Sequence, residues 1–179
     1  MEKVVLPPFK PRRTEEEIRK ECPWATTGRF GGRKPNIITS LELRSEEMEI
    51  INLRIQEKYK KIEESEVRFE EYMLDDAEYA IVAFGSAARI AKKSIEIARS
   101  QGIKVGLLRP ITLWPFPTKE VQKLGEKMKG ILSLEINAGQ MVEDIRLAVA
   151  GRVPVQHFGR LGGIIPDPDE VVDAIKRLF

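Results

Sequence analysis

Apolar and polar residues follow two different periods along the chain, and the change of period divides it. Between Ser45 and Ser65, apolar residues recur at steps of three and four, which predicts one long helix with a single apolar stripe. The stripe consists of Met48, Ile51, Ile55, Tyr59 and Ile62. About three heptads with one stripe favour a helix that lies across its own domain, and a coiled-coil partner remains an alternative.

After Ser65, short apolar runs alternate with amphipathic helical segments. The runs predict strands at residues 67–74, 79–84, 103–108, 131–136 and 153–158. Helices are expected at residues 87–100, 118–129, 140–150 and 167–178. Because helical crossovers of this length join parallel strands, the pattern predicts an α/β fold, a three-layer α/β/α sandwich with a mostly parallel sheet. A short turn follows the first run, which is therefore expected to be an antiparallel edge strand.

The first 44 residues follow neither period, because prolines and glycines interrupt them. Within them, the stretch from Thr14 to Glu17 matches a capping box, which predicts a short helix from Glu15 to Glu21. The segment has too few periodic apolar residues to form a core. The pattern therefore predicts three parts: a Pro/Gly-rich arm or linker at residues 1–44, a long amphipathic helix at 45–66, and an α/β domain at 67–179.

Composition excludes several classes of protein and site. Thirty basic and 28 acidic residues leave a net charge of +2, too small an excess for a nucleic-acid partner. One cysteine and one histidine exclude an internal disulfide, and they are too few for the usual zinc or iron–sulfur sites. No apolar run approaches 18 residues and no signal-peptide pattern opens the chain. These features predict a cytoplasmic protein without a membrane span.

Polar residues and glycines follow each of the predicted parallel strands. The carboxyl ends of parallel strands lie at one edge of a sheet, where ligands commonly bind. This carboxyl rim is the candidate interface or ligand site, and no catalytic, cofactor-binding or metal-binding residue is assigned in it. The candidate rim residues are Gly85, Ser86, Arg109, Trp114, Phe116, Glu135, Asn137, Gln140, Arg160, Gly162 and Gly163.

The first two rim residues allow a phosphate cradle or a plain corner between strand and helix. Gly85 and Ser86 lack the further glycines and the lysine of the known phosphate-binding fingerprints. We therefore expect Gly85 to make the corner and Ser86 to cap a helix that starts at Ala87. Trp114 and Phe116, in a proline-rich loop, are expected to form a packing or interface wedge.

The remaining rim groups also allow two interpretations each. Glu135 is either a general base or an anchor for a backbone amide or an arginine. Asn137 and Gln140 are expected to cap the next helix or to form hydrogen bonds across the rim. Arg160 either binds an anion with its neighbouring glycines or is tied to Glu135. His157 is expected to be a core or rim histidine, and no Ser-His-Asp order supports a hydrolase.

Several of these segments together resemble a known family, in order and spacing over roughly 110 residues from Val67 onward. The resemblance is to the carboxyl-terminal, transketolase C-terminal-like domain of the alpha subunit of 2-oxoacid:ferredoxin oxidoreductases, which act on 2-oxoglutarate, branched-chain 2-oxoacids or pyruvate. The matching stretches are AIVAFGS at 80–86, GIKVGLLRP at 102–110, WPFP at 114–117, EINAGQM at 135–141 and FGRLGG at 158–163. In the preceding linker the family pattern leads us to expect a Glu-His pair, and this chain has Glu42-Leu43-Arg44 instead.

The resemblance implies a structural and assembly domain that is not catalytic alone. It implies a complex that decarboxylates a 2-oxoacid with thiamine diphosphate and magnesium, reduces ferredoxin through iron–sulfur clusters and forms an acyl-coenzyme A, with none of these cofactors bound by this chain. The implied partners are the beta thiamine subunit, gamma and ferredoxin-like delta subunits and an amino-terminal alpha domain, in an oligomer. The alternative is a free-standing domain whose rim binds an anionic small molecule such as coenzyme A.

Overall fold

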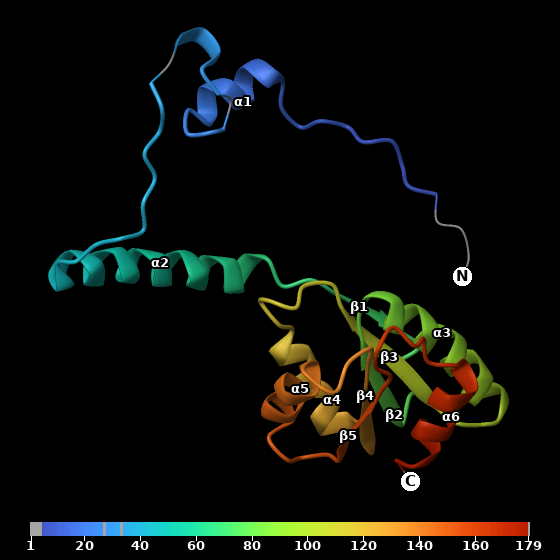
Figure 1. The fold of residues 1–179 in the computed structure, drawn as a ribbon. Coiled ribbons are helices and arrows are strands. Elements are labelled where there is room, and N and C mark those ends of the chain that lie inside the picture. Colours follow the sequence, from blue (N-terminus) through green and yellow to red (C-terminus); the bar gives the residue numbers. More distant parts are fainter. Residues whose placement is uncertain (1–4, 27, 33, 179) are drawn as a thin grey trace. The chain divides into compact units, whose positions relative to one another are not determined.

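A computed structural model describes residues 5–178 except residues 27 and 33, and divides the chain into two compact units, residues 1–49 and 50–179 (Figure 1). In the first unit, helix α1 spans Glu15–Glu21. The Thr14 hydroxyl accepts the Glu17 amide at 3.2 Å, and the Glu17 carboxylate accepts the Thr14 amide at 2.7 Å, so the predicted capping box is confirmed. A short 3-10 turn follows at Phe30–Gly32.

Helix α2 spans Ser45–Ser65, the bounds expected from the apolar stripe. None of its residues is buried by the described part of the chain. Along the stripe, Met48, Ile51, Ile55 and Ile62 are half-buried and Tyr59 is exposed. Within the second unit, the Tyr59 ring packs edge-on against Trp114, with ring centroids 5.3 Å apart. This contact sets the carboxyl-terminal half of α2 beside the α/β domain.

The second unit is built around a five-stranded sheet in the order β1-β3-β2-β4-β5 (Figure 1). Strands β2 to β5 are parallel, and β1 pairs antiparallel with β3 at the edge. The strands are β1 (Phe69–Tyr72), β2 (Tyr79–Ala83), β3 (Val105–Pro110), β4 (Gly130–Glu135) and β5 (Val155–Gly159). The helices are α3 (Gly85–Ser100), α4 (Thr118–Lys127), α5 (Met141–Val149) and α6 (Pro168–Lys176). The predicted three-layer sandwich with one antiparallel edge strand is confirmed.

Alternate residues of the sheet enter two separate cores. In β2, Ile81 packs with the side chains of α3 and α6, whereas Val82 packs with those of α4 and α5. A strand covered on both faces is apolar throughout, which explains the continuous run in the sequence. No helix in the part of the chain that the structure describes is long and apolar enough to span a membrane.

The start of α3 differs from the expectation. The helix begins at Gly85, with Phe84 as its N-cap, and no side chain caps it. Ser86 therefore lies in the first turn rather than at the cap, and the prediction of a Ser86-capped helix from Ala87 was wrong. Gly85 has a φ of +55°, a conformation that glycine adopts at little cost, so the corner itself is where the sequence placed it.

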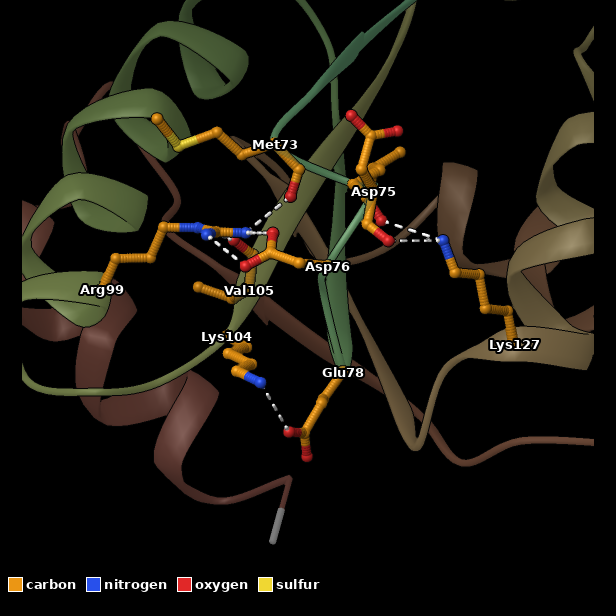
Figure 2. Close-up of polar contacts among 9 residues, drawn as sticks. Met73, Asp75, Asp76, Glu78, Arg99, Lys104, Val105 and Lys127 are labelled. Carbon is orange, nitrogen blue, oxygen red and sulfur yellow. Dashed lines mark hydrogen bonds and ion pairs between the residues drawn. The ribbon is translucent and has the colours of Figure 1, made fainter.

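The amino end of the sheet is fixed by the turn between β1 and β2 (Figure 2). From α3, Arg99 donates to the carbonyl oxygens of Met73 at 2.7 Å and Val105 at 2.8 Å, and it pairs with Asp76 at 2.8 Å. From α4, Lys127 donates to the carbonyl oxygens of Leu74 and Asp75, each at 3.1 Å. Basic residues near the carboxyl ends of two helices, one on each face of the sheet, thus hold the same turn.

Replacement of Arg99 by lysine tests this arrangement. Lysine keeps the charge but lacks the planar fork that reaches two carbonyl groups and Asp76 together. We expect Arg99→Lys to lower the free energy of unfolding by about 1–3 kcal/mol, measured by urea denaturation at neutral pH. Lys93→Ala, which removes an exposed pair with Glu96 on the same helix, is the control and should change it by less than about 0.5 kcal/mol. Equal losses of stability in Arg99→Lys and Lys93→Ala would contradict the role of Arg99 in holding this turn.

Candidate functional site

Glu135, the last residue of β4, is fully buried at the carboxyl rim. Its carboxylate accepts hydrogen bonds from the amides of Gln140 at 3.1 Å, Met141 at 2.9 Å and Val142 at 3.0 Å. It also accepts the Ser133 hydroxyl at 2.9 Å. The amides belong to the start of α5, where backbone donors have no partner within the helix. Glu135 therefore ties the end of β4 to the beginning of α5.

The charge state of Glu135 follows from these contacts. Burial raises the pKa of a carboxyl group, but the Met141 amide, the Ser133 hydroxyl and the Gln140 amide stabilise the charged form. The net result is that the pKa of Glu135 lies below its ordinary value. A buried, ionised carboxylate with four donors around it has no free position for a substrate proton. Its contacts are those of an anchor for backbone amides, not those of a general base.

His157 lies beside this carboxylate, because Ser133 and His157 are register partners in the neighbouring strands β4 and β5. Its Nε2 is 4.0 Å from the nearer Glu135 oxygen. That nitrogen is buried and has no hydrogen-bond partner among the described residues, although the whole side chain is 22% exposed. A Cβ at Gly159 would lie 2.9 Å from Nε2 and 2.3 Å from the Asn137 carbonyl oxygen, so glycine is required there.

The turn between β4 and α5 completes this part of the rim. The Asn137 side-chain oxygen accepts the Gly139 amide at 2.7 Å, which closes a short turn of the kind asparagine favours. Gln140 is the N-cap of α5, but its side chain makes no capping hydrogen bond. Glu135, Asn137 and the Gln140 amide are thus joined by contacts within one loop, and the expected side-chain cap from Gln140 is not formed.

The two rim arginines lie in separate groups. Arg109 pairs with Glu70 directly across β3 and β1 at 3.0 Å, and Lys92 of α3 pairs with the same carboxylate. The pKa of Glu70 is lowered, and the largest cause is the hydrogen bond from Lys92. Desolvation raises this pKa, but the hydrogen bond from Arg109 adds to that from Lys92 and the two outweigh it. Arg160 pairs with Glu170 of α6 at 3.3 Å. Of the two interpretations of Arg160, the tie to Glu135 is therefore not the one formed, because the guanidinium pairs with Glu170 instead.

The other candidates are spread along the rim. Trp114 is 54% exposed and contacts Tyr59, whereas Phe116 packs against the core on the α4 and α5 side. Gly85 and Ser86 are exposed at the start of α3. Gly162 and Gly163 are exposed, with φ values of +64° and +84°. Among the described residues, no hydrogen bond or ion pair joins these groups to Glu135. The same part of the chain contains no group of three or more His, Cys, Asp or Glu side chains that could hold a metal ion.

Ser133 was not among the predicted rim residues, and the approach of His157 to Glu135 was not predicted either. Ser133 and Glu135 are two residues apart in a strand, so they face the same side, a signal that the sequence does contain. The approach of His157 to Glu135 could not be found in this way. It requires β5 to lie next to β4, and strand order is set by the packing of the whole domain.

Replacement of Glu135 by glutamine tests the role of the carboxylate in folding. Glutamine can accept fewer of the four donors, and its own amide group is placed against them. We expect Glu135→Gln to lower the free energy of unfolding by about 2–3 kcal/mol at pH 7. Glu96→Gln, an exposed change on α3, is the control with little expected effect.

The difference in stability between the wild type and Glu135→Gln should depend on pH. The pKa of Glu135 is lower in the folded than in the unfolded protein, so its stabilising contribution is full above the unfolded value. It is lost as the pH falls below about 4.3 toward the folded value. The difference between wild type and Glu135→Gln should therefore shrink in acid, as measured by urea denaturation between pH 7 and pH 3. A difference that is constant with pH would contradict the ionised anchor.

Comparison with known proteins places these features in a family. The family model described as "Pyruvate:ferredoxin oxidoreductase core domain II" matches residues 77–171. Ketoisovalerate oxidoreductase subunit VorB of Methanothermobacter thermautotrophicus is 43% identical over 162 residues, which cover 90% of this chain and 46% of that protein. 2-oxoglutarate synthase subunit KorA of Methanothermobacter marburgensis is 31% identical over 104 residues, covering 58% of this chain and 28% of that protein. The chain thus spans about half the length of VorB.

Solved structures share the fold. The 2-oxoglutarate:ferredoxin oxidoreductase of Magnetococcus marinus, with 2-oxoglutarate, coenzyme A and succinyl-CoA bound, matches with a TM-score of 0.67 and 21% identity. The match covers 86% of this chain and 28% of that one. A split gene transketolase, an inactive beta4 tetramer, matches with a TM-score of 0.55 and 15% identity, covering 62% of this chain and 41% of that one. Since the family model matches more than half of its residues, the chain belongs to the 2-oxoacid:ferredoxin oxidoreductase family, as a protein that carries core domain II.

Proposed function

We propose that this chain is the core-domain-II part of the alpha subunit of a 2-oxoacid:ferredoxin oxidoreductase whose substrate is a branched-chain 2-oxoacid of the ketoisovalerate type. The supporting observation is the 43% identity with the VorB subunit over 90% of the chain. That match extends beyond residues 77–171 into the arm and α2, whereas the KorA matches, at 30–36% identity, cover 48–68% of the chain.

In this proposal the chain contributes to assembly and does not carry out the reaction alone. The complete enzyme would use thiamine diphosphate and magnesium for decarboxylation, iron–sulfur clusters for electron transfer to ferredoxin and coenzyme A as acyl acceptor. The charged rim groups Glu135, Arg109 and Arg160 are occupied by contacts within the chain. What the rim offers to a neighbour is the exposed surface around Ser86, Trp114 and the 162–163 glycine pair.

The proposal includes an organisation and a set of partners. The arm at residues 1–44 and the helix at 45–66 would connect the domain at 67–179 to the rest of the subunit. The partners would be an amino-terminal alpha domain and beta, gamma and ferredoxin-like delta subunits, in a cytoplasmic oligomer. The alternative of an anion-binding domain has less support, because each rim guanidinium already has a glutamate partner.

The test is reconstitution with the other parts of the oxidoreductase from the same source. The chain should copurify with them and restore coenzyme A- and thiamine-dependent reduction of a viologen dye. Ketoisovalerate should exceed 2-oxoglutarate and pyruvate by about ten-fold or more in kcat/KM. The matched control omits this chain. Failure to copurify would contradict the assembly role, whereas assembly with a preference for 2-oxoglutarate would contradict only the substrate class.

A further inference from the structure

An aromatic groove lies within the second unit, between the carboxyl-terminal half of α2 and the loop that follows β3. It has a volume of about 820 Å³. Its apolar lining consists of Val67, Phe69, Trp114, Pro115 and Phe116. The Trp114 ring is held edge-on against Tyr59 of α2, so one wall of the aromatic groove is a fixed indole that still leaves 54% of the residue exposed. Rings and a proline side by side form the kind of surface on which polyproline segments dock.

The rim of the aromatic groove carries an excess of negative charge. Three glutamates line it, Glu63, Glu64 and Glu120, against two lysines, Lys60 and Lys119. Lys60 is paired with Glu57 at 3.0 Å. Glu63 and Glu64 form no ion pair with another residue that the structure describes. Two adjacent carboxylates at the edge of an apolar groove favour a ligand that combines apolar and basic residues.

Such a segment occurs in the chain itself, ahead of α1. Residues 5–13 read Val-Leu-Pro-Pro-Phe-Lys-Pro-Arg-Arg, and Figure 1 shows them as an extended trace without helix or strand. Prolines at three of nine positions favour the polyproline II conformation, which is ordered before binding. Phe9 is 89% exposed. Arg13 pairs with Glu21, whereas Lys10 and Arg12 form no ion pair with a described residue.

We propose that the aromatic groove binds residues 5–13 of a second copy of the chain, as a polyproline II segment, in a reciprocal exchange of arms. Prolines and Phe9 would lie on the rings, and Lys10 and Arg12 would face Glu63 and Glu64. Every copy carries both the segment and the groove, so two copies related by a two-fold axis satisfy both sites at once. A pre-ordered segment loses little conformational entropy on docking, which favours the exchange. This inference does not rest on the proposed function.

The test follows association through Trp114. The chain has two tryptophans, so Trp24→Phe leaves Trp114 as the only tryptophan, which can be excited selectively over the three tyrosines. Sedimentation velocity of the full chain should show a concentration-dependent dimer, with a parallel change in Trp114 fluorescence. An excess of a synthetic peptide of residues 5–13 should dissociate the dimer. Because the peptide then fills the aromatic groove, the Trp114 fluorescence should stay at the value measured for the dimer. A monomer at every concentration, or a dimer that the peptide does not dissociate, would overturn the proposal.

A charge exchange tests the pairing of residues. The double change Glu63→Lys with Glu64→Lys should weaken the dimer about five- to ten-fold, and Lys10→Glu with Arg12→Glu should do the same. Combining all four changes should restore the affinity. Glu96→Lys on α3, away from the aromatic groove, is the matched control. Additive weakening in the fourfold variant would contradict the pairing, even if the chain dimerises by another surface.

Discussion

The carboxyl end of the sheet depends on the buried carboxylate of Glu135. It is placed there by β4, and it accepts amides from the first turn of α5 and the hydroxyl of Ser133. An ionised group at zero exposure is stable only because each of these donors faces it. The same contacts set the start of α5 beside the turn closed by Asn137, and the pairing of β4 with β5 places His157 Nε2 4.0 Å from the carboxylate. One interaction therefore positions the part of the rim where strand, loop and helix meet.

The opposite end of the sheet uses charge in the same way. Arg99 and Lys127 come from helices on opposite faces and hold the single turn that joins β1 to β2. A Cβ at Gly106 would lie 2.4 Å from the Met73 carbonyl oxygen, so the turn rests directly on β3. Charged residues at both ends thus stabilise the domain itself. The aromatic groove, in contrast, is an exposed surface away from these two charged clusters.

The architecture was predictable because the apolar runs of a doubly covered sheet are strong signals. The pattern from Tyr79 to Leu178 places every parallel strand and helix to within a few residues. Contacts that depend on strand order were not predictable, and the approach of His157 to Glu135 across β5 and β4 is one of them. The predicted cap of α3 was wrong for a local reason, since the helix begins at Gly85 and Ser86 therefore lies two positions after the N-cap residue Phe84. Sequence locates elements better than it locates the partners of their side chains.

Family membership gives this arrangement a context without assigning a reaction to it. The family model covers residues 77–171, which contain both the carboxyl rim and the anchored loop, whereas α2 and the arm lie outside it. Residues 67–69, at one side of the aromatic groove, also precede the family match. The domain thus presents a rim whose charged groups Glu135, Arg109 and Arg160 have hydrogen-bond or ion-pair partners within the chain.

Amide hydrogen exchange tests the central claim most directly. If the Glu135 carboxylate holds the start of α5, the amides of Met141 and Val142 should exchange slowly in the wild type. In Glu135→Gln they should exchange about ten-fold or more faster, in line with the loss of more than about 1.4 kcal/mol of local stability. Amides at the start of α6, capped by Asp167, should be unchanged. Equal protection of Met141 and Val142 in both proteins would contradict the account.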